Sequence, residues 1–420
     1  MSLRRLGTSL LLACGVLGAG ATPQQTLVVA AFPAVDEIIR AALPAFKREH
    51  PEAQVRVLSR SFEDHHTVLV TALSTASNLP DVMVLEEGYI GRFAAGARLV
   101  DLSQEPYLIK QQQARFAPFA FSQATAPSGA VVAVPSDIGP GTLLYRVDVL
   151  KAAGVTEAEL TQSWDSYIAA GVKIKAATGV SLLPHARNLA EIMMRAGIQP
   201  GDGQYFGANN QVLVESPRFV QAFEWALRLR KMNLDAGQTA WSAGWMDAIQ
   251  HAKVATVMSG AWMQGHFAHW VAPQGKGLWR AAQLPQASWN TWGGTFYTIP
   301  KGSKNKKLAW EFIRFMTMNA PVQLNAFKSQ AAFPALLEAY QDEFFDQPID
   351  YLGGQRARLL WREAAKHIAP VAVHELDLEA RIVVSNELNK VLDQGKAIAP
   401  ALHDARLTLE RLLRSGAAQP

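Results

Sequence analysis

The N-terminal third of the chain alternates between short apolar runs and amphipathic stretches. Residues 27–32 form a continuous apolar run typical of a buried strand, and residues 36–50 place apolar side chains at helical spacing until Pro51. The same alternation continues with a strand at 54–58, a helix at 67–76 and a strand at 80–85. This order predicts an α/β fold with a largely parallel sheet flanked by helices. In such sheets, ligands bind beyond the carboxyl ends of the strands.

Further along the chain, proline and glycine separate two predicted strands. Strands are expected at 131–135 and 142–146, on either side of the segment Ser136 to Gly141. This pattern indicates a crossing from one lobe to another, and residues 281–285 look like a second crossing. The other predicted elements are helices at 164–177, 217–232 and 306–318, strands at 253–260 and 295–300, and a helical tail at 383–413 with a break at Gly395.

Tryptophan is concentrated in one window. Seven of the eleven tryptophans are Trp241, Trp245, Trp262, Trp270, Trp279, Trp289 and Trp292. An indole ring presents a flat apolar face with one N–H at its rim, which suits the flat, C–H-rich faces of sugars. Some of these tryptophans are expected simply to pack in a hydrophobic core. Core packing explains their density poorly, because several stand beside Gly, Asn, Ser or Gln in turn-like sequence.

Composition and charge narrow the class of protein. With 420 residues, 49% of them hydrophobic and 18% charged, the chain suffices for two or three domains with a large core. The net charge is +4, and it becomes 4 − 2 = +2 without Arg4 and Arg5. This charge is too small and too scattered to indicate a nucleic-acid partner.

The N-terminus predicts export. Arg4 and Arg5 precede an apolar stretch at 10–17 and the cleavage-type sequence Ala19-Gly20-Ala21, so residues 1–21 are expected to form a signal peptide and the mature protein to reside in the periplasm. The single cysteine, Cys14, follows a sequence resembling a lipoprotein box, which leaves lipid anchoring as the alternative. The A-x-A match favours cleavage, and neither route provides a disulfide.

Catalytic and metal motifs receive little support. There is no G-x-S-x-G sequence, and His374-Glu375 lacks the second histidine of a metalloprotease helix. His65-His66 is expected to lie at a solvated helix start, without a third ligand, so no metal or other cofactor is predicted. Carboxylates do follow predicted strands, as Glu86, Glu87 and Asp137. These residues could act as a glycosidase pair or accept hydrogen bonds from sugar hydroxyls, and the residues alone leave both open.

Several segments together resemble a known family. They are Leu79-Pro80-Asp81-Val82, Val134 to Pro140 followed by Leu144 to Asp148, Lys253 to Trp262, Trp292 to Thr295, and Ile299 to Lys306 leading into Ala309 to Ile313. In order and spacing the chain resembles the extracellular solute-binding proteins of family 1, the sugar receptors of ABC importers, from about residue 26 to 413. The resemblance implies a two-lobe periplasmic-binding-protein fold with three hinge crossings and a ligand cleft between the lobes. Lobe 1 would comprise residues 26–137 plus 287–318, and lobe 2 residues 138–286 plus 319–415.

The resemblance also implies a set of ligand-binding residues. Trp262 matches a stacking aromatic, and Asp137 matches a polar residue at the first crossing. The remaining motif matches are Glu86, Glu87 and Tyr89 at the edge of the first lobe, Trp292, Gly293 and Gly294 in the loop near the cleft, and, more loosely, His185, Arg187 and Asn188. Trp241, Trp245 and Trp289 are expected at the rim or at subsites, and Trp270 and Trp279 in packing. Residues 375–381 should approach the cleft but carry no maltose-type aromatic.

The expected function is therefore a monomeric periplasmic receptor without catalytic activity. It would bind a mono-, di- or short oligosaccharide and deliver it to the permease subunits of an ABC transporter. Two alternatives within binding proteins are a glycerol phosphate, for which Arg187 is a candidate, and a polyamine held by carboxylates. A third is a glycoside-cleaving enzyme that would use Glu86 or Glu87 with Asp137.

Overall fold

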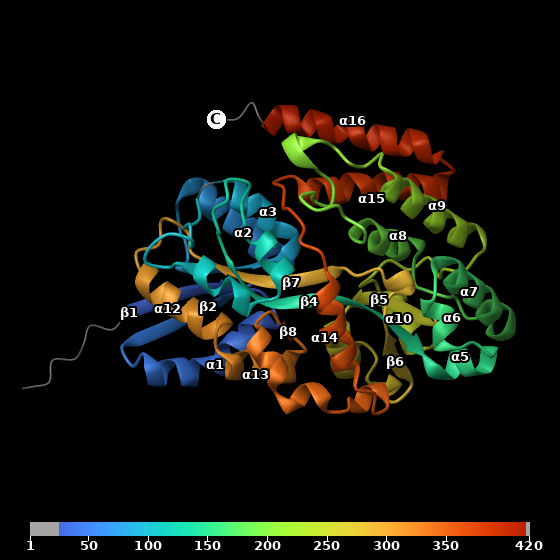
Figure 1. Ribbon diagram of the computed structural model, residues 1–420, viewed down its shortest axis with the longest axis horizontal. Coiled ribbons are helices and arrows are strands. Elements are labelled where there is room, and N and C mark those ends of the chain that lie inside the picture. Colours follow the sequence, from blue (N-terminus) through green and yellow to red (C-terminus); the bar gives the residue numbers. More distant parts are fainter. Residues whose placement is uncertain (1–24, 97, 417–420) are drawn as a thin grey trace, which may run out of the picture.

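The computed structural model describes residues 25–96 and 98–416, and one mixed sheet runs through this part of the chain (Figure 1). The strand order is β2-β1-β3-β7-β4-β5, with β6 and β8 also paired to β4. Strands β1 (Gln25–Ala31), β2 (Ala53–Ser59) and β3 (Val82–Glu86) are parallel, and β7 (Thr291–Thr298) is antiparallel to β3. The predicted α/β class and the parallel N-terminal strands are confirmed.

Helices cover both faces of the N-terminal strands. They are α1 (Val35–Glu49), α2 (Phe62–Thr75), α3 (Glu87–Ala95), α4 (Pro118–Gln123), α12 (Lys306–Thr317) and α13 (Ala320–Gln330). Leu27 and Val29 of β1 join the core that contains Phe46 of α1, whereas Ala30 joins the core that contains Leu69 of α2. Alternate side chains thus point to opposite covered faces, which explains the continuous apolar run of this strand.

Strand β4 (Val134–Arg146) crosses the molecule without interruption, where two strands and an irregular crossing were expected. Its first part pairs with β7, and its last part pairs with β5 (Thr256–Gly260) and β6 (Trp279–Ala282). The short β8 (Phe333–Pro334) pairs beside Asp137. The prolines and glycines produce register shifts rather than a chain break. Gly139 permits the close approach of β7, because a Cβ there would lie 1.9 Å from the carbonyl oxygen of Trp292.

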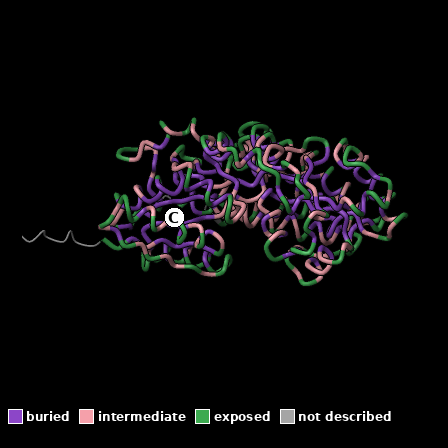
Figure 2. The backbone as a smooth tube through the Cα atoms, turned by 90° about the horizontal axis from the view of Figure 1, so that it is seen from below, coloured by how far each residue is buried: buried purple, intermediate pink, exposed green. Residues whose placement is uncertain are grey.

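The half of the molecule around β5 and β6, opposite the half that contains β1, β2 and β3, is mostly helical (Figure 1). Its helices are α5 (Val147–Ala153), α6 (Glu157–Thr161), α7 (Trp164–Thr178), α8 (Ala186–Arg195), α9 (Pro217–Lys231), α10 (Ala243–Gln250), α11 (Met263–His266), α14 (Ala357–His367), α15 (Asp377–Gln394) and α16 (Ile398–Gly416). The predicted break at Gly395 is confirmed, since this residue ends α15 in the left-handed conformation. Buried segments run through both halves of the elongated molecule (Figure 2).

Two expectations of the sequence remain predictions at the level of the fold. The lobe boundaries and the three hinge crossings follow from the family resemblance and stay predictions. The signal peptide and Cys14 lie outside the described residues. Within residues 25–96 and 98–416, none of the helices has the length and apolar character that a membrane crossing requires.

Candidate functional site

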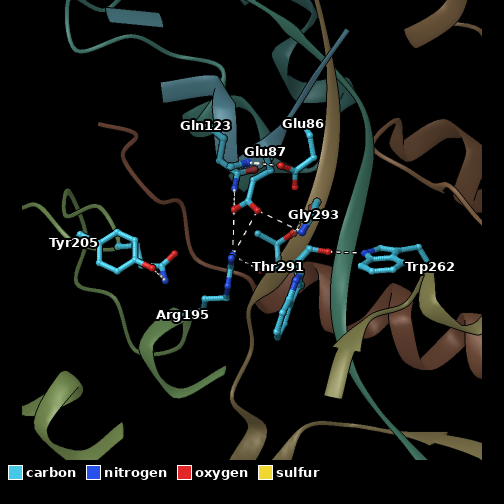
Figure 3. Close-up of polar contacts among 11 residues, drawn as sticks. Glu86, Glu87, Gln123, Arg195, Tyr205, Trp262, Thr291 and Gly293 are labelled. Carbon is cyan, nitrogen blue, oxygen red and sulfur yellow. Dashed lines mark hydrogen bonds and ion pairs between the residues drawn. The ribbon is translucent and has the colours of Figure 1, made fainter. Parts of the chain in front are cut away.

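Two adjacent carboxylates stand where β3 ends and α3 begins. Glu86 caps α3, and its Oε2 accepts a hydrogen bond from the N–H of Gly88 at 2.9 Å. The carboxylate of Glu87 accepts from Nε2 of Gln123 at 3.1 Å and from the N–H of Gly293 at 3.3 Å (Figure 3). The fold therefore brings Glu86, Glu87 and Gly293 together, although Gly293 is some two hundred positions further along the chain.

An ion pair joins the two halves of the molecule at this point. Arg195, the last residue of α8, places Nη1 at 3.4 Å from Oε1 of Glu87 and donates to the carbonyl oxygen of Thr291 at 3.3 Å. The two side chains of this pair are only 12% and 14% exposed. The guanidinium also lies over the ring of Trp292, 5.3 Å from its centroid. Helices α8 and α3 lie in different halves of the molecule (Figure 1), so this pair connects them directly.

Helix α15 contributes two further charged residues to the site. Asp377 and Arg381 line the same small cavity as Glu87 and Arg195, and the ring of Tyr205 lies there too. Two residues of the segment 375–381 thus reach the candidate site, and its approach to a cleft between the lobes stays a prediction. A second small cavity adjoins the first, and it shares Glu87, Gln123 and Arg195 with it.

Burial raises the pKa of two carboxyls of the site, Glu86 and Asp377, and of Asp137 on the neighbouring strand β4. Burial and the neighbouring Glu87 carboxylate raise the pKa of Glu86 well above its ordinary range, and the positive charge of Arg381 partly opposes this. Burial raises the pKa of Asp137 to about 6, opposed by the hydroxyl of Thr295. Burial likewise raises the pKa of Asp377 to about 7. Carboxyl groups in such surroundings need hydrogen-bond partners, and ligand hydroxyls can supply them.

An indole ring stands beside the carboxylates. Nε1 of Trp262 donates to the carbonyl oxygen of Trp292 at 2.7 Å, which fixes the ring against the start of β7. A Cβ placed on Gly293 would lie 3.2 Å from Nε1 of Trp262 and 3.9 Å from Oε1 of Glu86. The glycine thus leaves space between an aromatic side chain and a carboxylate. Gly294 lies next to it in β7, paired with Ile138 of β4.

The other tryptophans occupy different environments. Trp241 is 47% exposed, and its ring is stacked 6.2 Å from that of Trp262. The expected rim position of Trp245 is wrong, because its ring is buried in the core, where it packs against Trp241 at 5.0 Å. Trp289 stacks on His367 at 4.9 Å. The predicted packing role of Trp279 is confirmed, because its ring is fully buried. The same prediction for Trp270 is wrong, because this ring is 48% exposed.

His185, Arg187 and Asn188 begin helix α8. His185 is a buried N-cap that accepts a hydrogen bond from the N–H of Arg187 at 3.1 Å, and its other ring nitrogen faces Arg230 at 3.3 Å. Burial and these two arginines lower its pKa to about 4, so the ring is neutral at pH 7. Arg187 lies 3.9 Å from the carboxylate of Glu191. The structure thus gives His185 a capping role, one helix length from Arg195.

The expected solvated position of His65 and His66 is wrong, because both rings are buried. The ring of His66 stacks on Tyr89 at 3.8 Å, bonds to the carbonyl oxygen of Phe62 at 2.8 Å and accepts from the N–H of Glu86 at 3.2 Å. The pair therefore belongs to the packing that holds Glu86 and Tyr89 in place. No group of three or more His, Cys, Asp or Glu side chains that could hold a metal ion occurs in the part of the chain that the structure describes.

Comparisons with known proteins identify the family and the fold of the chain. The model of the bacterial extracellular solute-binding protein family matches residues 41–351. A lactose-binding protein of Rhizobium radiobacter is 25% identical over 357 residues, which cover 80% of this chain and 79% of that protein. The crystal structure of an extracellular solute-binding protein of family 1 matches with a TM-score of 0.82 at 24% identity, over 92% of this chain and 99% of the other. The sugar-binding protein MalE of Xanthomonas citri matches with a TM-score of 0.76 at 18% identity, over 94% and 98%. The predicted two-lobe α/β fold of periplasmic binding proteins is thereby confirmed.

Proposed function

We propose that this chain, which belongs to the family of bacterial extracellular solute-binding proteins, binds a mono-, di- or short oligosaccharide between Glu86 and Trp262 and delivers it to the permease of an ABC transporter. The juxtaposition of the Trp262 indole, the Glu86 carboxylate and the open backbone of Gly293 is the observation that carries this proposal. A sugar ring has an apolar face that stacks on an indole and an edge of hydroxyls that donate to carboxylates.

The buried carboxyls support selectivity for a hydroxylated ligand. Glu86 and Asp137 have raised pKa values because burial removes water from them. A ligand that lacks the matching hydroxyl would leave a buried acceptor without a donor, which costs on the order of 1–3 kcal/mol. Lactose, named for the relative from Rhizobium radiobacter, belongs to the same chemical class as the proposed ligand.

The ion pair between Arg195 and Glu87 supports a coupling of binding to closure. Because these side chains come from different halves, a ligand that contacts Glu86 and Trp262 would favour the arrangement in which the halves approach each other. We expect the permease to recognise this closed form. The predicted signal peptide at residues 1–21 and the extracellular nature of the family support a periplasmic location, with lipid anchoring through Cys14 as the alternative.

The test is a binding panel with the mature protein. Galactose, lactose, arabinose, maltose, glycerol 3-phosphate and spermidine are titrated by calorimetry, with tryptophan fluorescence as a second signal. We expect binding of at least one saccharide and no release of product. Trp262→Ala should abolish this binding, whereas Trp225→Ala, at a partly buried tryptophan of α9 beneath Arg228, should retain it.

Three outcomes would contradict the proposal. Failure of every saccharide to bind would refute it directly. Binding of glycerol 3-phosphate or spermidine alone would favour those alternatives. Hydrolysis of lactose or maltose that disappears in Glu86→Gln or Glu87→Gln would indicate a glycosidase.

A further inference from the structure

Trp262 is the first of three tryptophans whose rings form a row. The ring of Trp241 lies 6.2 Å from that of Trp262 and 6.0 Å from that of Trp270, with the planes inclined by 15° and 17°. At these centroid separations the neighbouring rings are offset and overlap only in part, so each ring keeps some of its face uncovered by the next ring. Trp241 and Trp270, the outer tryptophan pair, are 47% and 48% exposed. The row therefore continues the aromatic side of the candidate site onto the surface.

Histidine 266 fixes the row in position. Trp262, His266 and Trp270 are spaced four residues apart: Trp262 is the N-cap of α11, His266 ends that helix, and Trp270 lies in the π-helical turn Phe267–Val271 that continues it. The His266 ring lies edge-on to all three indoles at centroid distances of 5.3 to 5.8 Å. Its Nδ1 accepts from Nε1 of Trp270 at 2.9 Å. Because the exposed ring of Trp270 is held in one orientation, a ligand that stacks on it loses less conformational entropy on binding.

Trp241 has a backbone that a residue in simple packing would avoid. Its φ is +69°, in the left-handed region, which is uncommon for a bulky side chain and costs on the order of 1 kcal/mol or more. The buried ring of Trp245 supports it from beneath. The strain does not serve burial, since nearly half of the Trp241 side chain remains exposed. Strained residues of this kind are concentrated at ligand-binding sites, and π-helical turns are also frequent there.

We propose that the outer tryptophan pair provides further subsites for a linear oligosaccharide of at least three units, which extends out of the cleft from Trp262. This inference rests on the proposed function and specifies the ligand. Three offset rings in a row offer successive apolar faces, which a chain of sugar rings can occupy and a single monosaccharide cannot. Continuity with Trp262 favours a saccharide over a protein partner on this surface.

The test uses calorimetry with galacto-, arabino- and malto-oligosaccharides of one to five units. In the series that binds, we expect the affinity of the unmodified protein to rise at least tenfold from the dimer to the tetramer. Trp270→Ala should lower the affinity for the tetramer about tenfold, which corresponds to about 1.4 kcal/mol, and change that for the dimer less than twofold. Trp270→Tyr should retain most of the gain, because a flat ring remains. Trp225→Ala on α9 serves as the matched control.

The outcomes separate this inference from the proposed function. If no saccharide of any length binds, the proposed function fails. If saccharides bind without dependence on length, or if Trp270→Ala weakens the dimer and the tetramer equally, the outer subsites are refuted and the function stands. A circular dichroism spectrum and a urea midpoint like those of the unmodified protein establish that each variant is folded.

Discussion

Alanine at position 293 tests the site with the smallest possible change. Gly293 has a φ of +82°, so an L-residue there costs on the order of 1–2 kcal/mol of stability. The added methyl would lie 3.2 Å from Nε1 of Trp262, which is closer than ordinary van der Waals contact, and 3.9 Å from Oε1 of Glu86. Trp262 must therefore shift by a few tenths of an ångström, and the methyl occupies the space proposed for the ligand. We expect both a loss of stability and a loss of affinity.

Gly179→Ala separates these two effects. Gly179 ends α7 with a φ of +75°, and a Cβ there would meet nothing within 4 Å. Urea unfolding should show losses of about 1–2 kcal/mol in both variants. Calorimetry with the saccharide that binds best should show at least a tenfold loss of affinity, about 1.4 kcal/mol, for Gly293→Ala only. Unchanged affinity of Gly293→Ala, together with the expected loss of stability, would refute the placement of the ligand between Trp262 and Glu86.

Three further predictions concern ionisable residues in and around the site. Glu87→Gln should lower the free energy of unfolding by on the order of 3 kcal/mol, because it leaves Arg195 largely buried without its counter-charge. In urea unfolding, the double variant with Arg195→Met should recover part of this loss. A double variant that is less stable than Glu87→Gln alone would contradict this reasoning. Since burial raises the pKa of Asp137 to about 6 in the folded state, the folded state binds more protons than the unfolded state between about pH 4 and 6, and its stability falls as the pH rises through that window. The stability of Asp137→Asn relative to the unmodified protein should therefore increase from pH 4 to pH 6 and stay at that level at pH 7, as measured by urea unfolding at each pH. If the difference in free energy of unfolding between the two proteins does not depend on pH, the carboxylate of Asp137 is not destabilised by burial. His66→Phe preserves a ring against Tyr89 but leaves the N–H of Glu86 without its acceptor. About 1–3 kcal/mol of stability in urea unfolding and part of the saccharide affinity in calorimetry should therefore be lost. An affinity equal to that of the unmodified protein would show that His66 does not position Glu86.

Local sequence signals were sufficient for most elements of the fold. The run at 27–32 and the amphipathic stretch at 306–318 carry strand and helix patterns that the structure reproduces as β1 and α12. Gly395 marks the end of α15 because only a residue that readily adopts positive φ continues the chain there. In these cases the pattern of each segment already reflects which of its sides is covered.

Long-range pairing decided the features that the sequence did not predict. Proline and glycine between residues 135 and 141 suggested a chain break, but pairing with β7 on one side and β5 on the other keeps β4 continuous. His65 and His66 looked solvated, and they are buried because Phe32 and Tyr89, from other elements, pack against them. Neither contact has a signal within the segment itself.

The same limit applies to the site. Arg195 meets Glu87 across 108 positions, and Arg381 reaches the same cavity from α15, so no local motif identifies either residue. Part of the aromatic row did have a signal, since Trp262, His266 and Trp270 recur at the helical spacing of four, which places them on one face. The position of Trp241 between Trp262 and Trp270 is a long-range contact that this local pattern does not predict.

The start of β7 lies between the ion pair of the site and its aromatic ring. Figure 3 shows Arg195 and Glu87 on one side of Gly293 and Trp262 on the other. The N–H of Gly293 donates to Glu87, and the carbonyl oxygen of the preceding Trp292 accepts from Trp262, so one backbone turn connects both sides. Under the proposed function, we expect a ligand on the Trp262 side to act through this turn on the Arg195–Glu87 pair between the two halves. We therefore expect Gly293→Ala, which alters this turn, to weaken any change of the relative position of the halves that the ligand produces, without direct contact between the ligand and Arg195.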